Sequence, residues 1–238
     1  LRRMKSEAAL MTALGDIGGV WPVMQVTRAL TDLAITSVQA AIHYLLTQEA
    51  GRGRILPPNP AKPEEGCGLI VLAMGKMGAG ELNYSSDIDL IVFFDPDATT
   101  LDSDIEPQPF FVRLTQGLAR LLQQRSGEGY VFRVDLRLRP DPASTQVAIS
   151  TEAALHYYER EGRTWARAAM IKARPCAGDM KAGEAVVAEI APFVWRKHLD
   201  FAALADVHDM KRQMQTFRGQ SEITVEGHNV KVGRGGIR

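Results

Sequence analysis

The sequence has few of the residues that mark disulfide-stabilised, zinc-binding or exported proteins. It contains two cysteines among 238 residues, Cys67 and Cys176, far apart and without C-x-x-C spacing. Disulfide frameworks and thiolate zinc sites need clustered cysteines, so neither is expected, and a reducing cytoplasm is the expected location. The five histidines form no pair at the spacing of metal ligands.

Long hydrophobic runs and an excess of one charge sign are also missing. The longest apolar runs, LIVLAM and LIVFF, are far shorter than the roughly 20 residues of a membrane-spanning helix. The first residues, LRRMKSEAALM, lack the continuous apolar stretch of a signal peptide. Lys and Arg together number 28, as do Asp and Glu, so the net charge is zero and no basic stripe is evident. We therefore expect neither a membrane nor a nucleic acid as partner.

What is present is an ordinary globular composition, 45% apolar and 24% charged, with alternating helical and extended patterns. Helical periods cover residues 4–49, Phe110–Gln124 and 151–215. Buried strands are predicted at CGLIVLAMG and DIDLIVFFD, and GEGYVFRVDLRLRPDP alternates as a third strand. The segment SEITVEGHNVKVGRGGIR is predicted to be a hairpin or loop. These elements favour an α+β fold.

The same pattern suggests three segments. Residues 1–50 form an N-terminal helical segment, residues 51–150 contain the sheet after a proline-rich loop, and residues 151–238 are helical with a glycine-rich hairpin or loop at the end. The chain stops on GGIR in mid-pattern, so we expect a fragment of a longer protein.

Two aspartates stand at the mouth of a buried strand, where charge is costly. Asp87 and Asp89 are two residues apart, so their carboxylates share a face and repel each other unless a cation lies there. Asp135, on the alternating third strand, would add a third carboxylate, although a solvated charged face explains that strand equally well when it is taken alone. Oxygen ligands suit Mg²⁺ (or Mn²⁺), and three such acids can support in-line attack at phosphorus. The three acids are the predicted catalytic and metal-binding residues.

Residues around these acids are candidates for binding phosphate. The turn GKMGAG lacks the spacing of a dinucleotide-binding or P-loop motif, and a plain tight turn fits it as well as an anion cradle. The arginines that share the face of the third acid would balance phosphate charge or form surface ion pairs, and an exposed helix-end lysine is the simpler interpretation of Lys172. The candidate phosphate- or nucleotide-binding residues are Gly75, Lys76, Ser86, Arg133, Arg137, Arg139 and Lys172.

Four stretches, found in this order along the chain, point to one family. They are GKMGAGELNYSSDIDLI, YVFRVDLRLRP, YYEREGRTWARAAMIKARP and VKVGRGGIR. Together they resemble the bifunctional glutamine synthetase adenylyltransferase/adenylyl-removing enzymes, within the nucleotidyltransferase superfamily of DNA polymerase beta. The resemblance implies a polymerase beta-like mixed sheet with helices, flanked by helical N- and C-terminal segments. It also implies that Asp87 and Asp89 bind metal and that Asp135 is the third acid. Lys76 stands where many superfamily members have Ser or Thr, which leaves the triphosphate-cradling role of the turn open.

The resemblance also implies an activity. The family has two homologous halves: one attaches AMP to a tyrosine of glutamine synthetase, and the other removes it with phosphate and releases ADP. SSDIDL, FRVDLRLRP and VGRGGIR resemble the N-terminal, adenylyl-removing half. Metal-dependent phosphorolysis of adenylylated glutamine synthetase is thus implied, in the regulation of nitrogen assimilation, with the PII signal protein acting on the full-length enzyme.

Three alternatives remain open. ATP-dependent adenylylation by the same fold is the first of them. A regulatory module that has lost catalysis is the second, and the complete set of three acids argues against it. Nucleic-acid polymerisation is the third, and the zero net charge argues against it.

Overall fold

The computed structural model describes residues 1–97, 100–160, 164–195, 208 and 212. The chain divides into one compact unit, Leu1–Val194, and a second, Trp195–Arg238, which lies almost wholly outside the described residues. The predicted glycine-rich hairpin or loop and the helix expected after residue 195 fall in that second unit. The divisions expected near residues 50 and 150 both fall inside the first unit.

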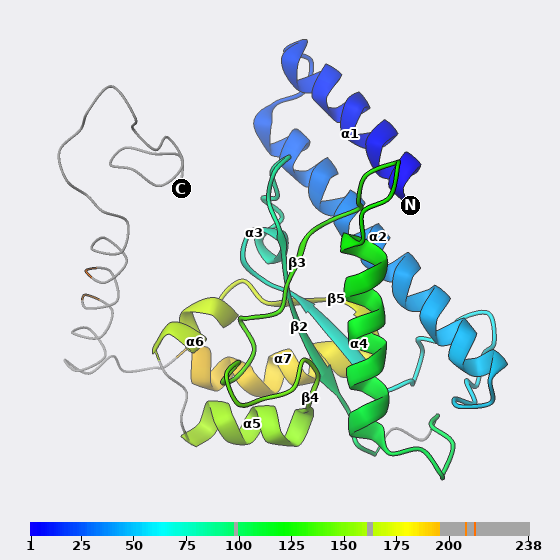
Figure 1. Cartoon of the computed structure of the whole chain (residues 1–238). Coiled ribbons are helices and arrows are strands. Elements are labelled where there is room, and N and C mark those ends of the chain that lie inside the picture. Colours follow the sequence, from blue (N-terminus) through cyan, green and yellow to red (C-terminus); the bar gives the residue numbers. More distant parts are fainter. Residues whose placement is uncertain (98–99, 161–163, 196–207, 209–211, 213–238) are drawn as a thin grey trace. The chain divides into compact units, whose positions relative to one another are not determined.

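Two helices open the chain, as predicted. They are α1 (Arg2–Ile17) and α2 (Val23–Gly51), which pack against each other as a hairpin (Figure 1). Gly19 takes a positive φ of 65° in the turn between them, a conformation that glycine adopts without strain. Pro22 stands just before α2, where its missing N–H costs no helical hydrogen bond.

Helix α2 is, in the part of the chain that the structure describes, the one helix long and apolar enough to cross a membrane by length and composition. Polar residues interrupt the apolar ones of this helix, so it contains no long continuous apolar run. However, 44% of its most apolar window is buried inside the protein. Its buried side chains, such as Leu30, Ala34 and Val38, recur at helical spacing and join the core against the sheet. A core helix has these properties.

A five-stranded mixed sheet forms the centre of the described unit. The strands are β1 (Leu69–Ala73), β2 (Ile88–Phe94), β3 (Val134–Asp135), β4 (Ile149–Ser150) and β5 (Arg174–Gly178). Their order is β3-β2-β1-β5, and β4 also pairs with β2. Strand β1 runs antiparallel to both of its neighbours, whereas β3 and β4 run parallel to β2. The predicted combination of helices with a mixed sheet is confirmed at this level.

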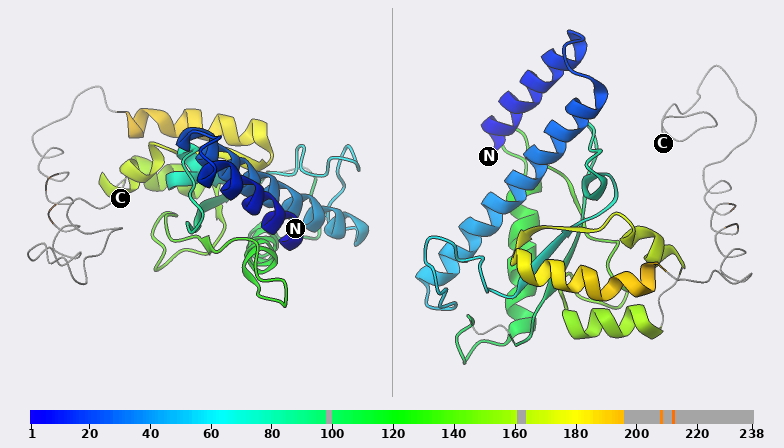
Figure 2. Two further views of the ribbon diagram at one scale, coloured as in Figure 1. Left: turned by 90° about the horizontal axis from the view of Figure 1, so that it is seen from above. Right: turned by 180° about the vertical axis from the view of Figure 1, so that it is seen from behind.

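Helices cover both faces of the sheet, so the described part of the chain has a hydrophobic core on each face (Figures 1 and 2). The remaining helices are α3 (Gly75–Ala79), α4 (Pro107–Gln123), α5 (Thr151–Arg160), α6 (Thr164–Met170) and α7 (Met180–Val194). Alternate residues of β2, such as Leu90 and Val92, pack in the core that includes α2 and α4. Their neighbours Ile91 and Phe93 pack in the core that includes α5, α6 and α7. Burial on both faces explains why β1 and β2 are continuous apolar runs.

The prediction of helix throughout residues 151–215 is wrong at Arg174–Gly178, which forms β5. Pro175 and Gly178 argue against a strand in the sequence, but β5 pairs with β1 alone, through a register shift between Val71 and Leu72. Proline is tolerated in such an edge strand, beside a bulge. At Gly178, φ is +78° and an added Cβ would lie 2.2 Å from the backbone oxygen of Leu69, so glycine is required there.

The long alternating third strand is also a wrong prediction, because only Val134 and Asp135 pair with β2. The carboxylate of Asp135 accepts a hydrogen bond from the backbone N–H of Arg137 at 2.9 Å, which turns the chain out of the ladder. The guanidinium of Arg139 then closes the loop that follows. It donates hydrogen bonds to the backbone carbonyls of Leu136, Pro142 and Thr145. Local hydrogen bonds therefore replace the predicted strand.

Candidate active site

Strands β2 and β3 bring two of the predicted acids together. In their parallel register Ile88 lies opposite Val134, and Asp89 lies opposite Asp135. Residues opposite each other on neighbouring strands project from the same face, so both carboxylates stand on one side of the sheet. Asp87 precedes Asp89 by two residues and lies just before β2. The apolar residues between and after them, Ile88 and Leu90, are fully buried in the other face, as predicted.

The glycine turn after β1 packs directly on one of these acids. The backbone N–H of Met74 donates to the carbonyl oxygen of Asp89 at 2.9 Å, and Gly75 follows with a φ of +53°. A Cβ atom added to Gly75 would lie 2.6 Å from Oδ2 of Asp89. The backbone conformation therefore favours glycine at this position, and an added Cβ would push the carboxylate of Asp89 aside.

Two arginines neutralise part of the acidic charge. Arg133 donates from Nε to Oδ1 of Asp87 at 2.5 Å, and Arg137 donates from Nη2 to Oδ2 of Asp135 at 2.5 Å. The hydrogen bond from Arg137 holds the pKa of Asp135 below its ordinary value. The pKa of Arg137 is raised, mainly by Asp135 and further by the charges of Asp89 and Asp87. The charges of all three carboxylates therefore act on this one guanidinium group.

The donor set in this region suits a hard divalent cation, because all three side chains offer carboxylate oxygens. In the described ranges, no group of three or more acidic, cysteine or histidine side chains is arranged to hold a metal ion. Asp87 and Asp135 are both paired with arginines in the structure. These five side chains carry three negative and two positive charges, which leaves one negative charge. The residues fit a metal whose charge would replace that of the guanidinium groups.

The other predicted phosphate-binding residues have contacts away from the three acids or stand beside them in sequence. Ser86 donates to the side chain of Asn83 at 2.6 Å, and Lys172 lies 3.2 Å from a carboxylate oxygen of Glu81. Lys76 is the second residue of α3. The partly buried guanidinium of Arg139 holds the loop after β3, and burial lowers its pKa. Their roles in phosphate binding remain predictions, whereas the structure places Arg133 and Arg137 beside the acids.

The family model for glutamate-ammonia ligase adenylyltransferase matches residues 1–189. The chain belongs to this adenylyltransferase family. The family resemblance predicted from the four motifs is thereby confirmed.

Relatives of this adenylyltransferase-family chain match it along its whole length. A protein of Bradyrhizobium diazoefficiens is 84% identical over all 238 residues, one of Rhodopseudomonas palustris CGA009 is 81% identical, and one of Xanthobacter autotrophicus is 61% identical. Each is named bifunctional glutamine synthetase adenylyltransferase/adenylyl-removing enzyme. The chain spans 24% of the length of each of these relatives.

Two residues that support the site of this family member were missed by the sequence analysis. The hydroxyl of Tyr130 accepts a hydrogen bond from Nη1 of Arg133 at 3.0 Å, while Nη2 of that arginine donates to the backbone oxygen of Ser85 at 2.8 Å. Gly78 allows α3 to approach the chain so closely that an added Cβ would lie 2.0 Å from the backbone oxygen of Lys172. No local pattern signals either contact, because both depend on tertiary packing.

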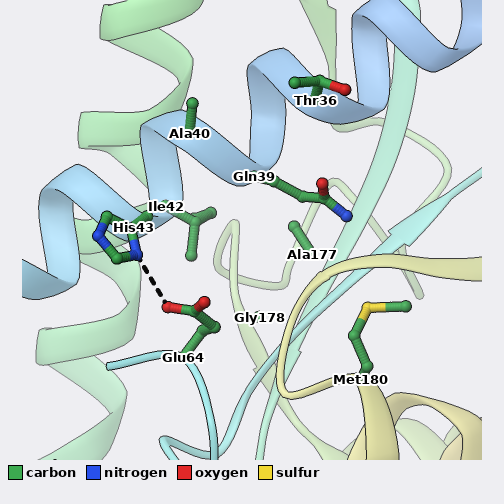
Figure 3. A pocket seen from close by; sticks show the side chains of 9 residues that line it. All are labelled: Thr36, Gln39, Ala40, Ile42, His43, Glu64, Ala177, Gly178 and Met180. Atoms are coloured by element: carbon green, nitrogen blue, oxygen red, sulfur yellow. Dashed lines mark hydrogen bonds and ion pairs between the residues drawn. The ribbon is translucent and has the colours of Figure 1, made fainter. Parts of the chain in front are cut away.

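A cavity of about 410 Å³ lies elsewhere, between α2 and the turn from β5 to α7 (Figure 3). Figure 3 shows His43 and Glu64 pointing toward each other, with 3.1 Å between Nδ1 and Oε2. The lining residue Gly178 pairs with Ile70 near the start of β1, whereas Asp89 bonds to Met74 just beyond the end of that strand. The cavity is therefore at the opposite end of β1 from the acids and is not part of their site.

Replacing Gly75 by alanine tests whether the glycine turn positions Asp89. We expect Gly75→Ala to reduce the phosphorolysis that the family resemblance implies about tenfold or more, because the new Cβ would displace the carboxylate. The assay is the rate of ADP release from adenylylated glutamine synthetase. Gly53→Ala is the matched control, since Gly53 has a φ of +71° but nothing within 4 Å of the added Cβ. Equal activity of both variants would show that the contact has no role.

Proposed function

We propose that this chain removes AMP from the adenylylated tyrosine of glutamine synthetase by Mg²⁺-dependent phosphorolysis, consuming phosphate and releasing ADP. The observation that carries the proposal is the parallel register of β2 and β3, which sets Asp89 opposite Asp135 with Asp87 two residues away. The names of the relatives include adenylyl removal. The motifs SSDIDL and FRVDLRLRP support the adenylyl-removing half over the other half.

In the proposed reaction an oxygen of inorganic phosphate attacks the phosphorus of AMP. A bond forms between them, the bond from phosphorus to the tyrosyl oxygen breaks, and a proton from the attacking phosphate neutralises the phenolate. The products are ADP and unmodified tyrosine. Asp87, Asp89 and Asp135 would hold Mg²⁺ (or Mn²⁺), which supplies neutralisation of the charge on the phosphoryl oxygens when bound.

The arginines of the site have a second use in this scheme. Arg133 and Arg137 pair with Asp87 and Asp135 in the structure, with side chains 50% and 83% exposed. With Mg²⁺ held by the carboxylates, the guanidinium groups of Arg133 and Arg137 would be available to donate hydrogen bonds to the attacking phosphate. Their forked geometry suits bidentate contact with phosphate oxygens.

The direction of the reaction is tested by offering both sets of substrates. With adenylylated glutamine synthetase, phosphate and Mg²⁺, we expect one ADP for each AMP removed, and no ADP when phosphate is omitted. With ATP and unmodified glutamine synthetase, we expect no pyrophosphate. Pyrophosphate without ADP would show that the chain catalyses adenylylation instead. Release of neither product would show that the chain is not catalytic alone. PII action on the full-length enzyme and a cytoplasmic location belong to the same proposal.

A further inference from the structure

Three cations gather around one aromatic ring beside the acids. The side-chain nitrogen of Lys5 lies 5.5 Å from the ring centre of Tyr130, and the guanidinium carbons of Arg125 and Arg133 lie 5.6 Å and 5.9 Å from it. We call these four residues the Tyr130 cluster. Cations at such distances from an aromatic ring are attracted by the ring, which orders them.

The cluster joins two parts of the chain that are distant in sequence. Arg2 donates from Nη2 to the backbone oxygen of Gln124 at 2.7 Å, which fixes the start of α1 next to Arg125. In Figure 1 the start of α1 lies beside the loop that follows α4. Lys5 is also within 6.0 Å of the ring centre of Phe132, a buried residue. The position of Lys5 therefore follows from the fold.

Most of the positive charge in the cluster is not compensated. Arg133 pairs with Asp87, but Lys5 and Arg125 form no ion pair with any residue that the structure describes. Arg125 is exposed and Tyr130 is partly exposed. A local excess of positive charge in a chain of zero net charge attracts anionic groups.

The cluster also adjoins the acids directly, because Arg133 contacts both Tyr130 and Asp87. An anionic group bound by Lys5 and Arg125 would therefore lie near Asp87, one of the proposed metal ligands. We propose that the Tyr130 cluster binds an acidic segment of the protein substrate that flanks its adenylylated tyrosine. This inference rests on the proposed function. Rim charges of this kind contribute to recognition of the partner and to its rate of association.

The test compares a protein substrate with a small one in the full chain. For the double variant Lys5→Ala/Arg125→Ala, we expect KM for adenylylated glutamine synthetase to rise about five- to tenfold, since each lost surface pair weakens binding modestly. We expect kcat and the reaction with O-adenylyl-tyrosine amide to stay unchanged. Raising the salt concentration should reduce the difference from wild type, because exposed charges are screened. The matched control is Arg113→Ala/Lys181→Ala, which removes two exposed cations outside the cluster.

A second arm tests the proposed partner class on the wild-type chain, so it does not depend on variant folding. Polyglutamate should compete with adenylylated glutamine synthetase and not with the small substrate. Stronger competition by a single-stranded oligonucleotide of equal charge would overturn the inference in favour of nucleic acid. An unchanged KM in the double variant, or an equal rise for both substrates, would also overturn it. A wild-type chain inactive on both substrates would contradict the proposed function instead.

Discussion

Asp89→Asn is expected to lower the rate of phosphorolysis by about a hundredfold to a thousandfold, which is the usual cost of removing one electrostatic contact to a transition state. The amide keeps the size of the carboxylate but removes the negative charge that would bind the cation. Asp89 lies at the centre of the site, opposite Asp135 in the strand register and against Gly75. The rate of ADP release at saturating substrate measures the effect.

The control for this variant is Asp32→Asn. Asp32 is an aspartate outside the site, which pairs with Arg28 at 3.0 Å on the exposed side of α2. We expect it to retain wild-type activity, and both variants to unfold within a few degrees of wild type. If Asp89→Asn kept more than a tenth of the wild-type rate, Asp89 could not be a metal ligand in the reaction.

Gly78→Ala is expected to destabilise the protein by about 3 kcal/mol or more, at the upper end of the usual cost of overpacking. The added Cβ would lie 2.0 Å from the backbone oxygen of Lys172 and 2.7 Å from that of Ala73. Backbone atoms cannot turn aside as a flexible side chain does, so α3 would have to move. Denaturant unfolding at equilibrium measures the change in the free energy of unfolding.

Gly51→Ala is the control for this prediction. Gly51 ends α2, and nothing lies within 4 Å of an added Cβ, so we expect a change of only a few tenths of a kcal/mol. Because α3 carries Gly75 against Asp89, the folded fraction of Gly78→Ala should also be less active. Equal stability of the two variants would contradict the close packing of α3 against the chain at Lys172.

The parts of the fold that the sequence predicts well are those whose burial is visible in local pattern. All five residues of β1 are buried, and so are six of the seven residues of β2, so both strands appear as apolar runs in the sequence. Period-two alternation also placed Asp87 and Asp89 on the face opposite to Ile88. These predictions needed no knowledge of strand pairing.

The parts that the sequence does not predict depend on pairing and on side-chain hydrogen bonds. The register that brings Asp135 opposite Asp89 is a contact between residues 46 positions apart in the sequence. Strand β3 is short because Asp135 and Arg139 make hydrogen bonds to nearby backbone groups. In the longer strand predicted from the sequence, the same side chains would lie on a solvated face. Strand β5 contains two residues that usually interrupt strands, and only its edge position makes them acceptable. The ring of cations around Tyr130 likewise has no local pattern.

The most direct measurement is a crystal structure of the chain soaked with Mn²⁺, with the metal located by anomalous scattering. We expect a peak bound by oxygens of Asp87, Asp89 and Asp135, at metal–oxygen distances of about 2.0 to 2.3 Å, with Arg137 turned away from Asp135. No peak at saturating Mn²⁺, or a peak bound by other residues while both ion pairs persist, would contradict a shared metal site.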